Sequence, residues 1–362
     1  MKIAYAVMGD GRGHVMRFLT LAPYLKGELL VFAGGDAYDF LKRYDSEHLI
    51  FRLIKIPAMQ YQISDGKILF VASFFSNLKQ ILDFKLNRSF PLRWRGVSPI
   101  TRYIQQEIAA FDPDLIVSDS EFYVQHVRRK APLVLLDRYS KIAFCRPNAV
   151  GNWSHRLQRS FNNLSYRFLM GRVDHVIATS FYPAQSLHRF KKKVSSFGPI
   201  IRDGIRSISS SEGQHVVVYA THSYIYSDHF LVELSKLNVP VVIYGAKSTK
   251  DLPNLLFKDI DPQEFIQDAA SSAYIIATPG NMLISEMGYL GKKMILIRTT
   301  PLEQREGSIN ALKIGIAQVI EPRDFTAEKV AEKLRKFKPY DSLHDESEHI
   351  ANKLLSFTRN RE

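Results

Sequence analysis

Short runs of apolar residues recur along the chain, and between them the apolar residues follow a helical period. In the first half, such runs predict strands over residues 3–8, 29–33, 115–118, 133–136 and 175–179. In the second half they predict strands over residues 215–220, 241–244, 274–277, 294–297 and 317–320. Apolar strands separated by helices are typical of parallel sheets covered by helices on both faces. The pattern therefore predicts an α/β protein with two doubly wound sheets.

The helical segments and one polar stretch divide the chain into two parts. Helices are predicted at about residues 14–25, 262–272, 281–290 and 305–314, with a last helix over 345–358. Residues 195–213 contain glycine, proline and a run of serines, which predicts an interdomain linker. We therefore expect an N-terminal domain over 1–198 and a C-terminal domain over 199–344, with residues 345–362 crossing back to pack on the first domain.

The charge of the chain lies in its first half. Residues 1–200 hold 29 Lys and Arg against 15 Asp and Glu, whereas the net charge of the whole chain is +13. The stretch from Arg138 to Arg172 has seven basic residues and no acidic one. This favours an anionic partner, such as a lipid surface, nucleic acid or a polyanionic substrate; a solvated basic face is the alternative interpretation.

The cysteine count and the apolar runs restrict the class of protein further. Cys145 is the single cysteine, which excludes an intrachain disulfide framework and a cysteine-based zinc site. No signal peptide is expected, and the longest apolar run, residues 68–75, is too short to cross a bilayer. We expect a cytoplasmic protein that works at the inner face of the membrane.

The first strand is followed by GDGRGH, residues 9–14, where a strand should meet a helix. The spacing of Gly9, Gly11 and Gly13 departs from the dinucleotide fingerprint G-x-G-x-x-G, although Asp36 keeps a nicotinamide cofactor open as an alternative. His14 would lie in the first turn of the helix, where a neutral imidazole is favoured and can act as a general base. Arg17 would share its face, and a purely structural histidine is the competing interpretation.

Two carboxylates follow another first-half strand, in PDLIVSDSEFY, residues 113–123. Asp119 would orient His14 and stabilise its protonated form, or would simply cap the next helix; Glu121 lies in the same loop. In the second half, Pro279, Gly280 and Asn281 open a helix whose N-terminus suits a diphosphate. Glu286 is placed to bond ribose hydroxyls, and Glu303 and Gln304 follow the next strand, where they would contact a sugar.

These motifs together resemble the GT-B nucleotide-sugar glycosyltransferases, and in particular the family of the UDP-N-acetylglucosamine transferase of peptidoglycan lipid-intermediate synthesis. The resemblance rests on GDGRGH with Arg17, on EFI-x-D-A, on TPGNMLISEMGYLGKK and on LEQREGSINA. It covers both domains in outline, but about 70 residues closely.

The resemblance implies roles for individual residues. Phe265 and Ile266 are similar to the uracil-contacting pair, Gly280 to the diphosphate-facing helix start, and Glu286 to the ribose carboxylate. Glu303 and Gln304 resemble the donor-sugar contacts, and His14 with Asp119 the base and its orienting carboxylate. A second glycine-rich loop of the family is replaced by YATHSYIYSD, residues 219–228, where His222 and Ser223 would supply donors to phosphate. Gly11, Arg12, Gly13, Arg17 and Glu121 are expected on the acceptor side.

The sequence therefore predicts an inverting glycosyltransferase that needs no metal or cofactor. It would move a sugar from a UDP-sugar to an anionic or polyprenyl-linked acceptor, with peripheral contact to an anionic membrane and no nucleic acid partner. An epimerase or hydrolase on the same fold and a non-catalytic nucleotide-sugar binding module are the alternatives. Incubation with UDP-N-acetylglucosamine alone would distinguish an epimerase or hydrolase from a transferase, because only an epimerase or hydrolase turns this sugar nucleotide over quickly without an acceptor.

Overall fold

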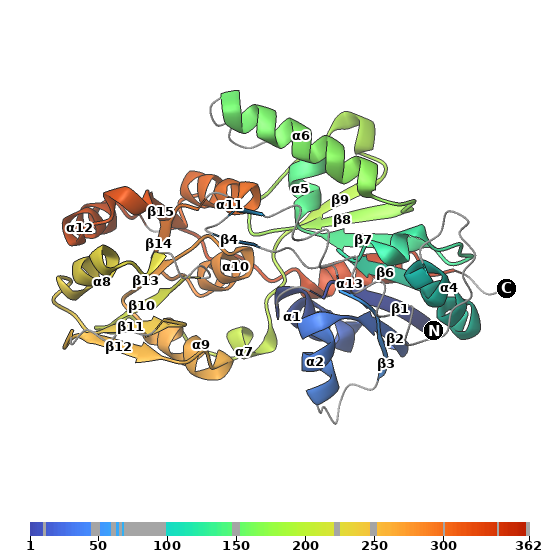
Figure 1. Cartoon of the computed structure of the whole chain (residues 1–362), viewed down its shortest axis with the longest axis horizontal. Coiled ribbons are helices and arrows are strands. Elements are labelled where there is room, and N and C mark those ends of the chain that lie inside the picture. The colour runs from blue at the N-terminus through green and yellow to red at the C-terminus, as the bar shows by residue number, and fades with distance from the viewer. Residues whose placement is uncertain are drawn as a thin grey trace.

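The computed structural model of the chain describes residues 1–9, 12–44, 51–58, 63–64, 67–68, 99–146, 153–220, 225–246, 252–299, 301–338 and 340–359. Within these residues two parallel sheets lie side by side, each between layers of helices (Figure 1). The strands β4 (Ile63–Ser64) and β5 (Lys67–Ile68) pair antiparallel and form a separate two-stranded sheet.

The first sheet has seven strands in the order β3-β2-β1-β6-β7-β8-β9. Its strands are β1 (Lys2–Val7), β2 (Glu28–Ala33), β3 (Phe51–Lys55), β6 (Leu115–Asp119), β7 (Leu133–Asp137), β8 (His175–Thr179) and β9 (Val194–Phe197). Its helices are α1 (Arg12–Leu21), α2 (Gly35–Arg43), α4 (Pro99–Phe111), α5 (Tyr139–Phe144) and α6 (Trp153–Leu169). Short 3₁₀ turns are η1 (Ala22–Tyr24), η2 (Tyr123–His126) and η3 (His188–Phe190).

The second sheet has six strands in the order β12-β11-β10-β13-β14-β15. Its strands are β10 (Val216–Tyr219), β11 (Val241–Tyr244), β12 (Leu255–Lys258), β13 (Tyr274–Ala277), β14 (Met294–Ile297) and β15 (Ala317–Ile320). Its helices are α8 (Asp228–Ser235), α9 (Pro262–Ser271), α10 (Asn281–Tyr289), α11 (Leu302–Lys313) and α12 (Ala327–Arg335), with a 3₁₀ turn η5 (Pro322–Asp324). The short α7 (Asp203–Arg206) precedes this sheet and α13 (Ser347–Leu355) follows it.

Both faces of each sheet are buried, as the apolar runs predict. On β1, Ile3 and Tyr5 belong to the core on one face, whereas Ala4 and Ala6 belong to the core on the other. The second sheet likewise separates two buried clusters. Side chains alternate between faces along a strand, so a strand apolar at every position requires cover on both sides. The predicted class, an α/β fold with two doubly wound sheets, is confirmed.

The last helix returns to the first sheet. Ile350, Ala351 and Leu354 of α13 are fully buried in the core that also holds Val15 and Phe18 of α1. The predicted crossing of the C-terminal helix is therefore confirmed, and Figure 1 shows α13 beside the first sheet. The boundary that we place between residues 198 and 199 stays a prediction.

The ten predicted strands lie within one residue of the observed ones, but three outer strands differ from expectation. β3, β9 and β12 were not predicted, and β9 occupies residues that we assigned to the linker over 195–213. Each of these strands is only partly buried. A strand at a sheet edge has fewer apolar positions, so it lacks the continuous run that marks a central strand.

Strand order fixes where chemistry is expected. In the first sheet the chain moves from β1 outward to β3 and then continues from β6 in the other direction, so the order reverses between β1 and β6. In the second sheet it reverses between β10 and β13. Ligands of open parallel sheets bind beyond the carboxyl ends of the strands at such reversals.

Candidate active site

The loop after β1 is held close to the end of β6. The Met8 backbone N–H donates a hydrogen bond to the Asp119 carbonyl oxygen over 3.1 Å. A Cβ atom at Gly9 would lie 2.3 Å from Ala58 Cβ and 2.9 Å from the Gly34 carbonyl oxygen, so only glycine fits there. This close approach fixes the position of Gly9 just beyond the end of β1, at the reversal of the sheet.

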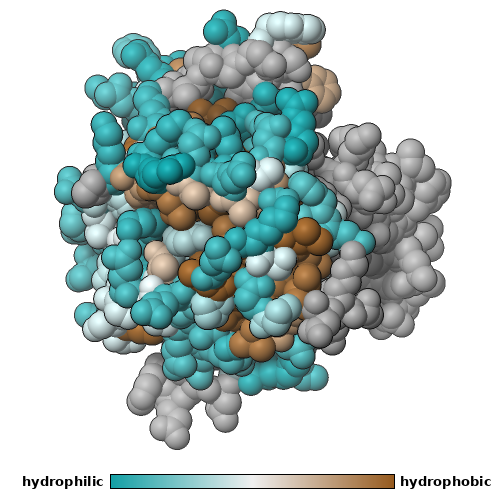
Figure 2. Space-filling model, turned by 90° about the vertical axis from the view of Figure 1, so that its left-hand side faces the viewer, coloured by the Kyte–Doolittle hydropathy of each residue, from teal (hydrophilic) through white to brown (hydrophobic). Residues whose placement is uncertain are grey.

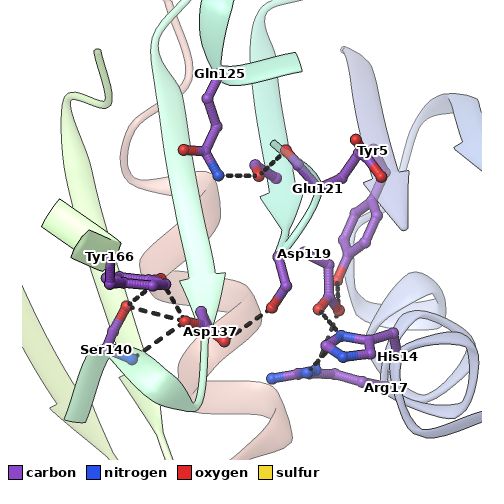
Figure 3. A network of polar contacts seen from close by, with 11 residues as sticks. Tyr5, His14, Arg17, Asp119, Glu121, Gln125, Asp137, Ser140 and Tyr166 are labelled. Atoms are coloured by element: carbon purple, nitrogen blue, oxygen red, sulfur yellow. Dashed lines mark hydrogen bonds and ion pairs between the residues drawn. The ribbon is translucent and has the colours of Figure 1, made fainter. Parts of the chain in front are cut away.

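His14 and Asp119 form a hydrogen-bonded pair at this point. His14 Nδ1 lies 2.7 Å from Asp119 Oδ1, although the two residues are 105 positions apart in the chain. The His14 side chain is 22% exposed and the Asp119 side chain is fully buried. Figure 3 shows both side chains pointing toward each other from α1 and the end of β6. The imidazole therefore has one edge fixed by the protein and keeps access to solvent.

Two further groups hold the second oxygen of Asp119. The Tyr5 hydroxyl donates to Oδ2 over 3.1 Å, and Arg17 Nε lies 3.1 Å from the same oxygen. Burial, and then the charge of Asp119, raise the pKa of Tyr5 well above its ordinary value, so the phenol stays a donor. Burial lowers the pKa of Arg17, but the Asp119 carboxylate and other acidic neighbours outweigh this effect and raise the pKa overall. Asp119 is thus fixed in position by contacts to both of its oxygens.

These contacts determine the tautomer of His14. Nδ1 faces Asp119 Oδ1 at 2.7 Å and an Arg17 nitrogen at 2.9 Å. A guanidinium only donates and a carboxylate only accepts, so Nδ1 cannot bond both at once. The proton on Nδ1 satisfies the buried carboxylate, which leaves the lone pair of Nε2 free to take a proton from a substrate.

A second buried carboxylate, Asp137, ends the neighbouring strand β7. Its Oδ1 accepts from Ser120 Oγ over 2.8 Å, and its Oδ2 accepts from the Ser140 backbone N–H over 3.1 Å and from the Tyr166 hydroxyl. Ser120 adopts a φ of 57°, a left-handed conformation that is strained for serine. The network, drawn in Figure 3, fixes the residue that follows Asp119 and so supports the position of that carboxylate.

Glu121 lies apart from the His14 pair. Its side chain is buried, and its Oε1 accepts from the Tyr123 backbone N–H over 3.0 Å. Burial raises the pKa of Glu121 to about 7, and the hydrogen bond from Tyr123 opposes this only in part. Its expected place on the acceptor side stays a prediction.

The N-terminus of α10 meets the first domain close to α1. Ser180, directly after β8, donates through Oγ to Asn281 Oδ1 over 2.7 Å. A Cβ atom at Gly13 would lie 4.0 Å from Met282 Cε. Gly280 is the N-cap of α10 and Pro279 precedes it. The structure therefore brings the predicted diphosphate-facing helix start near the turn that carries His14.

The carboxylates predicted to bind the donor are engaged by arginines. Both oxygens of Glu286 accept from Arg202, from Nε over 2.6 Å and from a terminal nitrogen over 2.8 Å. Burial raises the pKa of Glu286, and Arg202 opposes the rise. Glu303 Oε1 lies 3.0 Å from Arg138 Nε of the first domain. Gln304 accepts from Thr299 Oγ1 over 2.5 Å.

Other predicted site residues lie elsewhere or outside the described residues. Phe265 and Ile266 are 8% and 7% exposed and belong to a core of the second domain. Arg12 begins α1, but its side chain is not among those described. Asp36 lies in α2 rather than at the end of β2. Gly11, His222 and Ser223 lie outside the described residues.

Sequence reasoning missed the arginines that join the two domains. Arg138 contacts Glu303, and Arg159 of α6 lies 2.7 Å from Glu306 of α11. Burial, opposed by Arg159, raises the pKa of Glu306. Arg138 directly follows the carboxyl end of β7, at the same edge of the sheet as Asp119 at the end of β6, and this position could have marked it in the sequence.

The described residues contain no group of three or more histidine, cysteine, aspartate or glutamate side chains placed to hold a metal ion. None of the helices in this part of the chain combines the length and the apolar character needed to cross a bilayer.

Comparison with solved structures supports the fold at low sequence identity. The chain is similar to a UDP-glucose:anthocyanidin 3-O-glucosyltransferase in complex with UDP, with a TM-score of 0.61 at 13% identity over 98% of this chain and 93% of that one. It is similar to the glycotransferase of kitacinnamycin, with a TM-score of 0.58 at 12% identity over 99% and 95% of the two chains. For MurG of Acinetobacter baumannii the TM-score is 0.53 at 12% identity over 99% and 95%.

The family itself is shown at the level of sequence. No curated protein sequence matches the chain. The model of glycosyl transferase family 1 matches residues 1–337, which span both sheets. The two-sheet fold is that of GT-B glycosyltransferases, as the sequence motifs predict. The chain belongs to glycosyl transferase family 1 and is a glycosyltransferase.

Proposed function

We propose that the protein is an inverting, metal-independent transferase that moves a sugar from a UDP-sugar to an anionic or lipid-linked acceptor in cell-envelope or polysaccharide synthesis. The observation that carries the proposal is the His14–Asp119 pair, 2.7 Å apart and next to the start of α10. A general base oriented by a buried carboxylate suits deprotonation of a hydroxyl nucleophile.

In the proposed reaction the acceptor hydroxyl gives its proton to His14 Nε2. The hydroxyl oxygen attacks the anomeric carbon of the donor sugar, and the bond from that carbon to the diphosphate oxygen breaks. UDP leaves with the electron pair, and inversion follows from attack opposite the leaving group. Asp119 stabilises the imidazolium that forms, and backbone N–H groups at Gly280 and the first turn of α10 meet the charge on the diphosphate.

The donor assignment rests on the second domain and on the nucleotides of similar proteins. One neighbour was solved with UDP and another, VinC, in complex with dTDP. For this chain we propose that Glu286 bonds the ribose, in exchange for part of its contact with Arg202. The donor sugar would lie near Glu303 and Gln304. In the structure Glu303 contacts Arg138 of the first domain, and Gln304 accepts from Thr299. Phe265 and Ile266 would then contact uracil mainly through the backbone of α9.

A thermal-shift panel of UDP, GDP, dTDP, CMP and NAD, with and without EDTA, tests the donor. A ligand at ~100 times its dissociation constant adds about 2.7 kcal/mol of stability. We expect a selective shift with UDP that EDTA leaves unchanged. A shift with NAD alone would overturn the proposal, and a UDP shift abolished by EDTA would refute metal independence.

The rate of UDP release tests whether His14 acts as the general base. We expect His14→Ala to lower the rate of UDP release about 10²- to 10⁴-fold, the usual loss for a general base. The wild-type protein should release UDP from UDP-N-acetylglucosamine only slowly without an acceptor. Rapid turnover of that sugar nucleotide alone would point instead to an epimerase or hydrolase.

A further inference from the structure

Helix α6 turns three polar side chains, Arg159, Asn163 and Tyr166, toward the protein. Arg159 donates to the Ile142 carbonyl oxygen over 2.9 Å, and Asn163 donates to the same oxygen over 3.1 Å. Tyr166 donates to Asp137, and Arg159 also pairs with Glu306. The inner face of the helix is therefore held by hydrogen bonds and an ion pair as well as by packing.

The outer face of the same helix is apolar and exposed. Trp153, Leu157, Phe161 and Leu164 are 77%, 63%, 69% and 69% exposed. Their spacings of four, four and three residues place them along one side of a helix, and we call them the outer stripe. A surface helix ordinarily turns its apolar side inward. On α6 four large apolar side chains face outward instead, and no described residue of the chain covers them, which marks the outer stripe as a contact surface.

Helix α6 lies at the outer edge of the first domain, beyond α5 and β9 (Figure 1). Exposed apolar residues of the second domain are instead scattered over separate elements, for example Leu256 on β12 and Leu312 on α11. The end of the second domain in Figure 2 is mostly hydrophilic, with small separate hydrophobic patches. The outer stripe is thus a local feature of α6 rather than a general property of the surface.

The surroundings of the outer stripe are basic. Arg156 is exposed on α6, and the chain from Arg138 to Arg172 carries no acidic residue. Near the C-terminal end of α6, the Arg189 guanidinium lies 4.8 Å from the centre of the Phe190 ring, whereas Arg167 turns inward and donates to the Ala143 carbonyl oxygen. An open hollow of about 410 Å³ is lined by Arg146, Leu187, His188 and Arg189. Anionic headgroups fit such a rim, whereas a second copy would bring like charges together.

We propose that α6 docks the protein on an anionic lipid bilayer, with the outer stripe inserted at the headgroup level and the arginines on the lipid phosphates. A helix that lies in the interface combines large apolar side chains on one face with basic residues at its flanks. Docking here would hold the reaction centre near the bilayer, because Tyr166 of α6 bonds the Asp137 network next to Asp119. The lipid-linked acceptor belongs to the proposed function, but the binding to lipid does not depend on it.

Sedimentation with vesicles tests this without any nucleotide. We expect the full-length protein to bind phosphatidylglycerol-containing vesicles, to bind pure phosphatidylcholine vesicles far less, and to be released in part by 1 M salt. Leu157→Ser/Phe161→Ser should lower the partition coefficient about tenfold or more, because two inserted side chains are lost. The matched control, Leu256→Ser/Ile260→Ser, removes two side chains of the second domain that are 55% and 51% exposed and should bind as the wild type does.

Three results would overturn the proposal. One is a wild-type protein that does not bind anionic vesicles. Another is a Leu157→Ser/Phe161→Ser variant that binds these vesicles as well as the control variant does. The third is a wild-type dimer that the α6 substitutions convert to a monomer while vesicle binding stays unchanged. In that case a second copy of the chain would cover the outer stripe. Calorimetry with UDP on the same variants distinguishes membrane docking from the proposed function. Loss of vesicle binding with unchanged UDP affinity supports docking through α6. If the wild type does not bind UDP, the proposed function fails, but the vesicle experiment still tests docking.

Discussion

At the scale of single residues, the proposed base, His14, lies against a carboxylate that no solvent reaches. Asp119→Asn keeps the size of the side chain but removes the charge that holds the Nδ1 proton of His14 and stabilises the imidazolium. We expect kcat to fall about 10²- to 10⁴-fold, as for loss of the base itself, because the pair acts as one unit. UDP release under saturating donor measures the effect.

Tyr5→Phe is the matched control for this prediction. It removes one donor from Asp119 Oδ2 while Arg17 keeps the other contact 3.1 Å away. We expect a loss of less than about tenfold, since Arg17 still holds the carboxylate in place. If Asp119→Asn were as active as Tyr5→Phe, Asp119 would be a structural residue and not the partner of the base.

A second residue-scale prediction concerns Glu121. Its pKa is raised to about 7 by burial, so the folded state holds a proton that the unfolded state releases at lower pH. Its protonated form therefore contributes stability that is present at pH 4 and is lost as the pH rises through 7. Glu121→Gln stays neutral and keeps an oxygen for the Tyr123 N–H. The free energy of unfolding of the variant, measured relative to that of the wild type, should therefore be about 2–3 kcal/mol higher at pH 8 than at pH 4.

Urea unfolding at several pH values measures this. The expected signature is a difference in the free energy of unfolding between variant and wild type that grows between about pH 5 and pH 7.5. A constant difference over that range would mean that Glu121 is already ionised in the folded protein.

At the scale of elements, the contact between α6 and α11 joins the two domains through a buried ion pair. The Arg159 and Glu306 side chains are 12% and 3% exposed. Arg159→Gln leaves the Glu306 carboxylate buried without this guanidinium, and we expect a loss of about 2–4 kcal/mol in the free energy of unfolding. Arg159→Gln/Glu306→Gln should recover most of that loss, because the buried charge is gone. Equal destabilisation by the single and double variants would show that the pair itself contributes little.

The same elements show what the sequence can and cannot predict. Central strands are apolar throughout, so β1, β6 and β13 were found, and with them the loops that carry His14, Asp119 and Gly280. Edge strands such as β9 have no such pattern because one side is open to solvent. Arg159 and Arg202 were missed for a different reason: an ion pair between residues more than 80 positions apart leaves no local signal in the sequence.

At the scale of the whole molecule, the C-terminal helix links the end of the chain to the first domain. Leu354 of α13 is fully buried among residues of α1 and β1, and Arg359 beyond it donates its backbone N–H to the Asp114 carbonyl oxygen over 2.9 Å. The helix also places Asp345 on Arg206, which lies between the two sheets, with Asp345 Oδ2 accepting over 2.7 Å. The packing of α13 therefore bears on both the stability of the first domain and its position relative to the second.

Leu354→Ala separates these two roles. We expect a loss of about 2–4 kcal/mol in the free energy of unfolding, the usual effect of a large-to-small change in a core. The cavity lies under α1, so the loss should appear in the unfolding of the first domain, while the second domain keeps its affinity for UDP because its core is separate. Urea unfolding followed by UDP calorimetry below the transition measures both. A variant that unfolds at lower urea but binds UDP normally supports two cores joined by the returning helix. Parallel loss of stability and of UDP affinity would instead show that the two sheets behave as one cooperative unit.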